Sequence, residues 1–323
     1  MNDMPLILED YLNYMETIKG SSPNTTKEYF YDLRSFFRFI KIRYKLIDKN
    51  TPFQEILIED VDIELIKKIN IQDLHAYIAF MDKNKKNKNS AKSRKVSSLK
   101  SFYNYLYSIV GLIDENPAEK LSAPKLDNRQ PVYLTLEESK KLLDTVLKTE
   151  NEFLRKRDYA IVLLFLNCGL RLSELSSIDM DKIKSDTLTV IGKGNKERTI
   201  YLNPSCIYAI EDYLTIRPTD ALDKKALFLS IRKQRISNRA IQRRIDKYLE
   251  DAGFDTSIYS THKLRHTAAT LMYKHGNVDI RALQEILGHE NVATTQIYTH
   301  IDDERLRNAV NSNPLSHIKP NKD

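Results

Sequence analysis

The sequence has few cysteines and no long hydrophobic run. Its two cysteines, Cys168 and Cys206, form neither a CxxC motif nor a disulfide framework, which suits a reducing compartment. No stretch approaches the roughly 18 apolar residues of a membrane span. The opening MNDMPLILEDYL carries acids where a signal peptide carries lysines. These absences predict a soluble, cytoplasmic protein with no membrane partner.

Glycine is also scarce, with eight residues in the whole chain. Enzymes that bind nucleotides through glycine-rich loops need several glycines at fixed spacing. The one glycine-rich piece, IGKGNKER at 191–198, lacks the GxxxxGK[ST] spacing that surrounds nucleotide phosphates. We therefore expect no ATP site and no cofactor.

The chain does have the length and apolar content for a packed interior. Its 323 residues are 41% hydrophobic and exceed what one ordinary core needs, so we expect about two domains. The formal net charge is +7. A basic surplus of this size favours a polyanionic partner but is weak evidence by itself.

The first third of the chain has helical periodicity. In 22–40, apolar residues recur at helical spacing, and Thr25 and Glu28 have the spacing of a capping box. Two further helical patterns cover 69–81 and 90–109. This part of the chain is predicted to be a helical bundle.

A basic run, KNKKNKNSAKSRK at 83–95, holds seven Lys and Arg residues and no acid. It has two interpretations, a solvated loop and an element that contacts DNA phosphates. Because the run leads into a helix with a polar face, Arg94 and Lys95 are candidate DNA contacts.

A break in the pattern follows at 116–135, which contains three prolines and little periodicity, as an interdomain linker should. We predict a helical N-terminal domain at 1–115, a linker at 116–133 and a second domain at 134–323.

The second domain is predicted to be mainly helical with a small sheet. Thr135 and Glu138 form a capping box, and a helix over 157–169 ends at Gly169, a residue suited to a helix C-cap. The segment 186–202 alternates in polarity around a Gly-Lys-Gly-Asn turn, which indicates a β-hairpin.

A later helix, within 232–253, has a cationic outer face. The stripe expected to be buried consists of Ile241, Ile245 and Leu249. By the helical period, Arg239 and Arg243 point away from this stripe. Such a face suits either a solvated surface or entry into a DNA major groove, and both interpretations stay open on these residues alone.

HKLRHTAATL, at 262–271, places His262, Arg265 and His266 on one helical face. The HxxxH spacing occurs in zinc helices, but Lys263 stands where a metalloprotease has its glutamate. The charge of Arg265 would repel a cation, so we predict an anion site without a metal.

Four motifs place these residues in a larger pattern. Together they resemble the signature boxes of the tyrosine recombinase family and follow one another in the family's order: GLRLSEL, GKGNKER, HKLRHTAAT and LGHENVATTQIYTH. The resemblance is greatest to the Xer type of this family. The resemblance covers 134–310 well and the N-terminal domain more loosely. It implies a SAM-like, helical core-binding domain at 1–115. It also implies a mixed α/β catalytic domain with a small antiparallel sheet and a C-terminal tail helix.

The resemblance also implies a catalytic set, namely Arg171, Lys193, His262, Arg265, His289 and Tyr298, with Glu174 in a supporting role. Tyr298 would attack the DNA phosphodiester, with His262 accepting its proton and Lys193 protonating the leaving 5′-oxygen. The two arginines suit this chemistry because guanidiniums stay charged and bind phosphate oxygens in a planar, bidentate manner.

The expected partners are double-stranded DNA with a specific recombination site and other recombinase protomers, in a homotetramer or a heterotetramer with a second recombinase. The resemblance leaves open whether a DNA translocase activates the reaction. Resolution of chromosome or plasmid dimers is the preferred function. The alternatives are an integrase or resolvase of a mobile element and, in another class, a DNA-binding protein that does not cleave. The segment 41–68 is longer than the usual connection in Xer-type N-terminal domains, and its role stays open.

Overall fold

The computed structural model describes residues 4–48, 50–85, 89–123, 132–192, 197–276 and 278–288, and within 83–90 it describes backbone only. The chain divides into two compact units, Met1–Asn128 and Arg129–Asp323. Lys193, His289 and Tyr298 lie outside the described residues, as do 124–131 of the predicted linker and the predicted tail helix.

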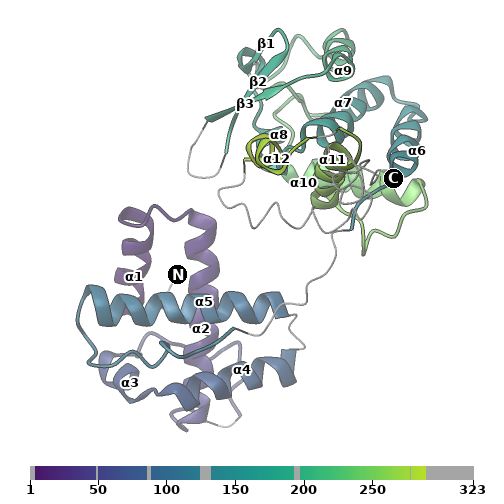
Figure 1. Cartoon of the computed structure of the whole chain (residues 1–323). Helices are drawn as coiled ribbons and strands as arrows, with labels where there is room; N and C mark the ends of the chain where they lie inside the picture. The colour runs from purple at the N-terminus through teal and green to yellow at the C-terminus, as the bar shows by residue number, and fades with distance from the viewer. Residues whose placement is uncertain are drawn as a thin grey trace, which may run out of the picture. The chain divides into compact units, whose positions relative to one another are not determined.

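The first unit is helical throughout its regular elements (Figure 1). These are α1 (Leu6–Thr17), α2 (Pro23–Arg43), α3 (Ile63–Lys68), α4 (Ile71–Lys85), α5 (Asn89–Asn104) and a π-helical turn, η1 (Tyr105–Ile109). In Figure 1, α5 lies across α2. Aromatic side chains such as Phe36 and Phe102 are fully buried in the core of this unit. The predicted helical bundle is therefore present.

The start of α2 differs from the sequence prediction. Ser22, rather than Thr25, is the N-cap residue, and its hydroxyl accepts a hydrogen bond from the Thr25 backbone N–H. Pro23 occupies the first helical position, where its fixed φ fits and its missing N–H costs nothing. The predicted capping box of Thr25 and Glu28 is wrong, because both residues lie inside the helix.

The long segment after α2 packs against that helix. Ile56, Ile58 and Val61 are buried. Two cations of α2 hold the segment in place, since Arg38 donates to the Ile56 carbonyl at 2.8 Å and Lys41 contacts Asp60 at 2.7 Å. This segment, part of the long 41–68 stretch, therefore contributes to the core of the first unit.

The second unit combines helices with a small sheet. Its helices are α6 (Leu136–Leu147), α7 (Glu152–Cys168), α8 (Leu172–Ser176), α9 (Pro204–Leu214), α10 (Asn238–Asp251), α11 (Thr261–His275) and α12 (Ile280–Leu287), with a 3-10 turn, η2 (Met180–Lys182). Its strands β1 (Ile183–Lys184), β2 (Thr187–Ile191) and β3 (Glu197–Tyr201) form one antiparallel sheet in the order β1-β2-β3. The predicted mixture of helices and a small antiparallel sheet is confirmed, and β1 is an addition to the predicted hairpin.

The local signals of this unit agree with the sequence. The capping box of Thr135 and Glu138 is present, and Gly169 is a left-handed C-cap with φ +59°. The helix α7 is the centre of the core, because it is buried along most of its length and packs against α6, α9 and α11. Cys168 and Cys206 are buried and not disulfide-bonded.

No described helix is both long enough and apolar enough to cross a membrane.

Candidate active site

Arg171 is positioned by the end of α7. The left-handed turn at Gly169 stops that helix, and Arg171 becomes the N-cap residue of the short helix α8. A side chain at position 169 would crowd α12, because a Cβ there would lie 2.8 Å from a methyl carbon of Leu287. The glycine thus lets the end of α12 approach the end of α7.

The Arg171 side chain makes two contacts that point it toward α12. Its Nη1 donates to Oε1 of Glu174 at 2.6 Å, and its Nη2 donates to the carbonyl of Gly288 at 2.7 Å. The side chain is 32% exposed, so one part of the guanidinium can meet a ligand from solvent.

Arg265 reaches the same place from α11. It is 4% exposed, and it donates from Nη1 to the Gly169 carbonyl at 2.6 Å and from Nη2 to the Leu287 carbonyl at 2.5 Å. The ends of α7 and α12 are therefore joined by one guanidinium, whose planar donors fit two acceptors at once.

Glu174 is the buried anion of this cluster, with 1% of its surface exposed. Besides Arg171, it contacts Nη2 of Arg198 at 2.9 Å, and Nη1 of Arg265 is 3.9 Å away. Burial alone would raise the pKa of Glu174, but the hydrogen bonds and charges of Arg198 and Arg171 lower it below its usual value. The carboxylate therefore stays ionised at neutral pH.

Arg198, on β3, is a member of the cluster that the sequence prediction missed. It donates to the Ile286 carbonyl as well as to Glu174. One signal in the sequence could have found it. Arg198 shares a strand face with the buried Ile200, and an arginine on the inward face of a strand usually has a buried partner.

Together, three arginines bind the last three carbonyls at the end of α12. Arg198, Arg265 and Arg171 donate to Ile286, Leu287 and Gly288 in that order. These carbonyls have no partner within an ideal helix, and the negative end of the helix dipole lies there, so cations stabilise the position. The next residue in the sequence is His289.

His262 lies in the first turn of α11, the helix that also carries Arg265. Its ring lies 4.6 Å from that of His266 in an edge-on arrangement, and the residue is exposed at the surface. Partial burial of the ring lowers the pKa of His262, and the positive charges of Arg265 and Lys263 lower it further. The imidazole is therefore neutral at pH 7 and can accept a proton. Among the described residues, no three histidine, cysteine or carboxylate side chains gather as metal ligands.

Both candidate DNA contacts of the first unit have an internal partner. The buried Asp32 accepts from Nη1 of Arg94 at 2.5 Å and from Nζ of Lys95 at 2.6 Å. The side chain of Arg94 remains 38% exposed, whereas that of Lys95 is 10% exposed. Lys95 joins α5 to α2, and its role as a DNA contact stays a prediction.

The outer face of α10 agrees with its sequence pattern. Ile241, Ile245 and Leu249 are buried, and Arg239 and Arg243 are exposed. Contact of these arginines with DNA is a separate prediction.

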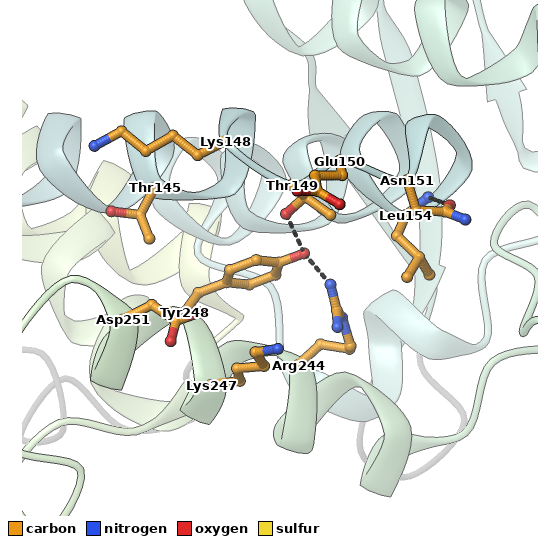
Figure 2. Close-up of a pocket in the computed structure, with 10 residues that line it drawn as sticks. All are labelled: Thr145, Lys148, Thr149, Glu150, Asn151, Leu154, Arg244, Lys247, Tyr248 and Asp251. Atoms are coloured by element: carbon orange, nitrogen blue, oxygen red, sulfur yellow. Dashed lines mark hydrogen bonds between the residues drawn. The ribbon is translucent and has the colours of Figure 1, made fainter.

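On another side of α10, Tyr248 and Arg244 line a cavity of about 440 Å³ against the α6–α7 connection. Figure 2 shows the Tyr248 hydroxyl between Thr149 and Arg244. Arg244 and Tyr248 also bond to the buried Asp158 of α7, at 2.7 and 2.8 Å. This cavity shares no residue with the arginine cluster, and its polar contacts hold α10 in place.

Comparisons with known proteins agree with this architecture. Residues 132–305 match the sequence model described as the phage integrase family. The chain therefore belongs to the phage integrase family.

Two similar proteins show which type of phage integrase family member this chain is. A protein named tyrosine recombinase XerC from Caldanaerobacter subterraneus subsp. tengcongensis is 58% identical over 313 residues, which cover 97% of this chain and 88% of that protein. Another protein of the same name, from Thermodesulfovibrio yellowstonii, is 34% identical over 98% of this chain and 99% of its own length. The chain is a tyrosine recombinase of the Xer type, as the four motifs predicted.

Solved structures share the fold. XerH site-specific recombinase, described as a post-cleavage complex with its palindromic difH substrate, superposes with a TM-score of 0.68 at 20% identity, covering 95% of each chain. The Tn1549 transposon integrase, in complex with transposon right end DNA, gives a TM-score of 0.69 at 18% identity, covering 94% of this chain and 98% of that one.

Proposed function

We propose that this enzyme recombines double-stranded DNA at a specific site and resolves chromosome or plasmid dimers. The observation that carries the proposal is the convergence of Arg171 and Arg265 beside the buried Glu174. Two guanidiniums held by the protein, of which that of Arg171 is partly exposed to solvent, suit a phosphodiester, which gains negative charge in its transition state.

In the proposed reaction, the phenolic oxygen of Tyr298 attacks the phosphorus atom. A bond from Tyr298 to the 3′-phosphate forms, and the bond to the 5′-oxygen breaks. His262 accepts the phenolic proton, and Lys193 donates a proton to the leaving 5′-oxygen. Attack by the 5′-hydroxyl of a second DNA strand then reverses these steps with a new partner. The phosphotyrosine conserves the ester bond, so the cycle needs no ATP.

The remaining site residues bind and orient the phosphate. Arg171 and Arg265 contact its two non-bridging oxygens, and His289 donates a hydrogen bond to one of them. Glu174 orients Arg171. These positive groups supply the charge stabilisation that metal ions supply in many other nucleases, so no metal is required.

Both units of the chain are proposed to contact the duplex. The first, with Arg94 and Lys95, is the core-binding domain, and the second presents Arg239 and Arg243 on α10. The buried stripe of α10 and the hydrogen bond from Arg244 to Asp158 hold this helix against the rest of the unit. Arg239 and Arg243, on its exposed face, can therefore approach a DNA groove.

The active form is proposed to be a tetramer on two DNA sites. One structural relative is described as a lambda integrase tetramer bound to a Holliday junction. The identity to proteins named XerC favours a housekeeping role in chromosome segregation and cell division, and a heterotetramer with a second recombinase. A chromosomal substrate places the enzyme in the cytoplasm.

The test is recombination between two copies of the enzyme's own site. Fragments of the host genome are first trapped as covalent complexes to find the site. Two copies are then placed on one supercoiled plasmid, and two smaller circles are expected. Relaxation of a plasmid without the site would instead indicate a topoisomerase. Binding of the site without strand exchange, both by this enzyme alone and in a mixture with a second recombinase, would contradict the proposal.

A further inference from the structure

Arg198 connects two parts of the arginine cluster, namely the carboxylate of Glu174 and the end of α12. Its side chain is 14% exposed and lies on β3. One end of its guanidinium binds Glu174, and the other binds the carbonyl of Ile286. Because the Arg198 side chain is less exposed than the 32% exposed side chain of Arg171, it is less suited to bind a phosphate that arrives from solvent.

The stem of Arg198 is also held closely. A Cβ at Gly288 would lie 2.9 Å from Cδ of Arg198 and 3.0 Å from its Nε. Gly288 has φ +63°, a conformation that favours glycine. The arginine is therefore packed along its length against the end of α12.

The charges around Glu174 show what Arg198 contributes. The carboxylate is buried, so it must be balanced by nearby cations. Its Oε2 accepts both from Arg198 and from the Arg171 backbone N–H, at 2.9 and 2.7 Å. Without Arg198, the cations left beside the carboxylate among the described residues would be Arg171 and Arg265, whose Nη1 is 3.9 Å away. Both cations would then be drawn toward Glu174 and away from a phosphate.

We propose that Arg198 is a positioning residue for DNA cleavage, which neutralises Glu174 so that the guanidiniums of Arg171 and Arg265 stay available to the scissile phosphate. This inference rests on the proposed function. It assigns Arg198 no contact with the DNA.

The first test compares Arg198→Met with a matched control, Arg235→Met. Arg235 also binds carboxylates and carbonyls in the second unit, namely those of Asp179, Asp223, Ile178 and, at 3.4 Å, Ser176 at the end of α8, and none of these four residues belongs to the cluster. Cleavage of a nicked site is measured in a single turnover, and the DNA Kd is measured separately. Arg198→Met is expected to slow cleavage roughly 10- to 100-fold, the cost of misplacing a catalytic group, and to change Kd by less than about threefold.

The control variant should cleave within about threefold of the unmodified protein. Equal losses in both variants would show a general loss of stability and would overturn the proposal. Normal cleavage by Arg198→Met would overturn it as well. If Arg198→Met does not fold, Arg198→Gln decides the question. A glutamine can still form hydrogen bonds but has no charge to neutralise Glu174, so cleavage by this variant should be slower, and an unchanged rate would overturn the proposal.

A double-mutant cycle tests the route through Glu174. In a Glu174→Gln background there is no carboxylate charge to neutralise, so adding Arg198→Met is expected to cost at most about threefold. A loss as large as in the unmodified background would mean that Arg198 acts by another route.

A measurement on the DNA-free protein separates this inference from the proposed function. The side-chain Nε–H signal of Arg171 in an NMR spectrum is expected to shift and broaden in Arg198→Met and to stay unchanged in Arg235→Met. An unchanged Arg171 signal in Arg198→Met contradicts the positioning role. Absence of cleavage by the unmodified protein, with the expected Arg171 change, contradicts the proposed function alone.

Discussion

At the scale of single residues, the two site arginines are held in different ways. Arg265 is buried and spans two backbone carbonyls, whereas Arg171 is one-third exposed and pairs with Glu174. Arg265 is thus fixed before DNA arrives, and part of Arg171 faces solvent. Fixed donors are valuable in catalysis because they need no reorganisation when charge develops.

Arg265→Lys should therefore impair cleavage although it keeps the charge. A lysine offers one ammonium in place of the planar fork that reaches both Gly169 and Leu287. We expect the single-turnover cleavage rate to fall about 100-fold, or roughly 3 kcal/mol of transition-state stabilisation. Arg217→Lys is the control, because Arg217 also binds backbone carbonyls in this unit, those of Ala226 and Leu227. Near-normal cleavage by Arg265→Lys would remove Arg265 from the phosphate site.

The pH dependence of cleavage should report His262. Its pKa is lowered below the ordinary 6.5, so the neutral ring that accepts a proton predominates at pH 7. Titration of His262 should therefore leave the cleavage rate unchanged above pH 7. Below pH 6.5 the cleavage rate is expected to fall, because the ring becomes protonated and can no longer accept a proton. His262→Gln should lower the rate and remove this acid-side fall, while the exposed His275→Gln on the same helix should change neither. An acid-side fall that persists unchanged in His262→Gln would exclude this histidine as the base.

At the scale of elements, the site depends on helix ends that come close together. Gly169 and Gly288 are left-handed caps of α7 and α12, and their carbonyls accept from Arg265 and Arg171. The geometry of the arginine cluster is thus set by where two helices stop.

Gly169→Ala should destabilise the second unit. The left-handed φ costs an alanine roughly 1 kcal/mol, and contact of the new Cβ with Leu287 adds about 1 to 3 kcal/mol. Gly253→Ala is the control, because Gly253 also has a positive φ, +79°, but its Cβ would meet only Lys141 Nζ at 3.9 Å. The free energy of unfolding of both variants is measured by denaturant titration. Equal losses would show that the close approach of Leu287 does not matter.

The first unit should depend on Asp32 in a comparable way. Replacing it with alanine leaves Lys95 buried without its carboxylate, which is expected to cost about 3 kcal/mol of unfolding free energy. Glu64→Ala is the control, because Glu64 pairs with Lys67 at the surface, where both side chains are exposed, and its loss should cost less than about 1 kcal/mol. Similar losses from both variants in denaturant unfolding would contradict the burial argument.

Local signals predicted much of this architecture, and non-local contacts explain what they missed. The helical periodicity, the cap at Gly169 and the hairpin depend on neighbours in sequence, and the structure confirms them. Arg198 was missed because it stands in a charged run, while its partners Glu174 and Ile286 lie 24 and 88 residues away. The burial of Lys95 depends likewise on Asp32, 63 residues away.

The catalytic set was predicted through resemblance to a family, since nothing in composition distinguishes Tyr298 from the other tyrosines among the 18 in the chain. The structure adds the physical reason for two members of the set. Arg171 and Arg265 lie 94 positions apart in sequence and meet because α7, α11 and α12 pack together. Their roles in the reaction remain predictions.

At the scale of the whole molecule, the account makes one central claim: a basic, metal-independent site transfers a DNA strand to a tyrosine of the same chain. The two units, the cationic face of α10 and the buried arginine cluster all serve this reaction in our proposal. The claim concerns a covalent bond, so it can be tested without knowledge of the assembly.

The most direct measurement is covalent trapping on nicked DNA that carries the site, in the presence of EDTA, followed by denaturation, digestion and mass spectrometry of the linked peptide. The account predicts a nucleotide attached through its 3′-phosphate to Tyr298, with no adduct in Tyr298→Phe although that variant still binds the site. An adduct on another residue, an adduct that persists in Tyr298→Phe, or cleavage abolished by EDTA would contradict it.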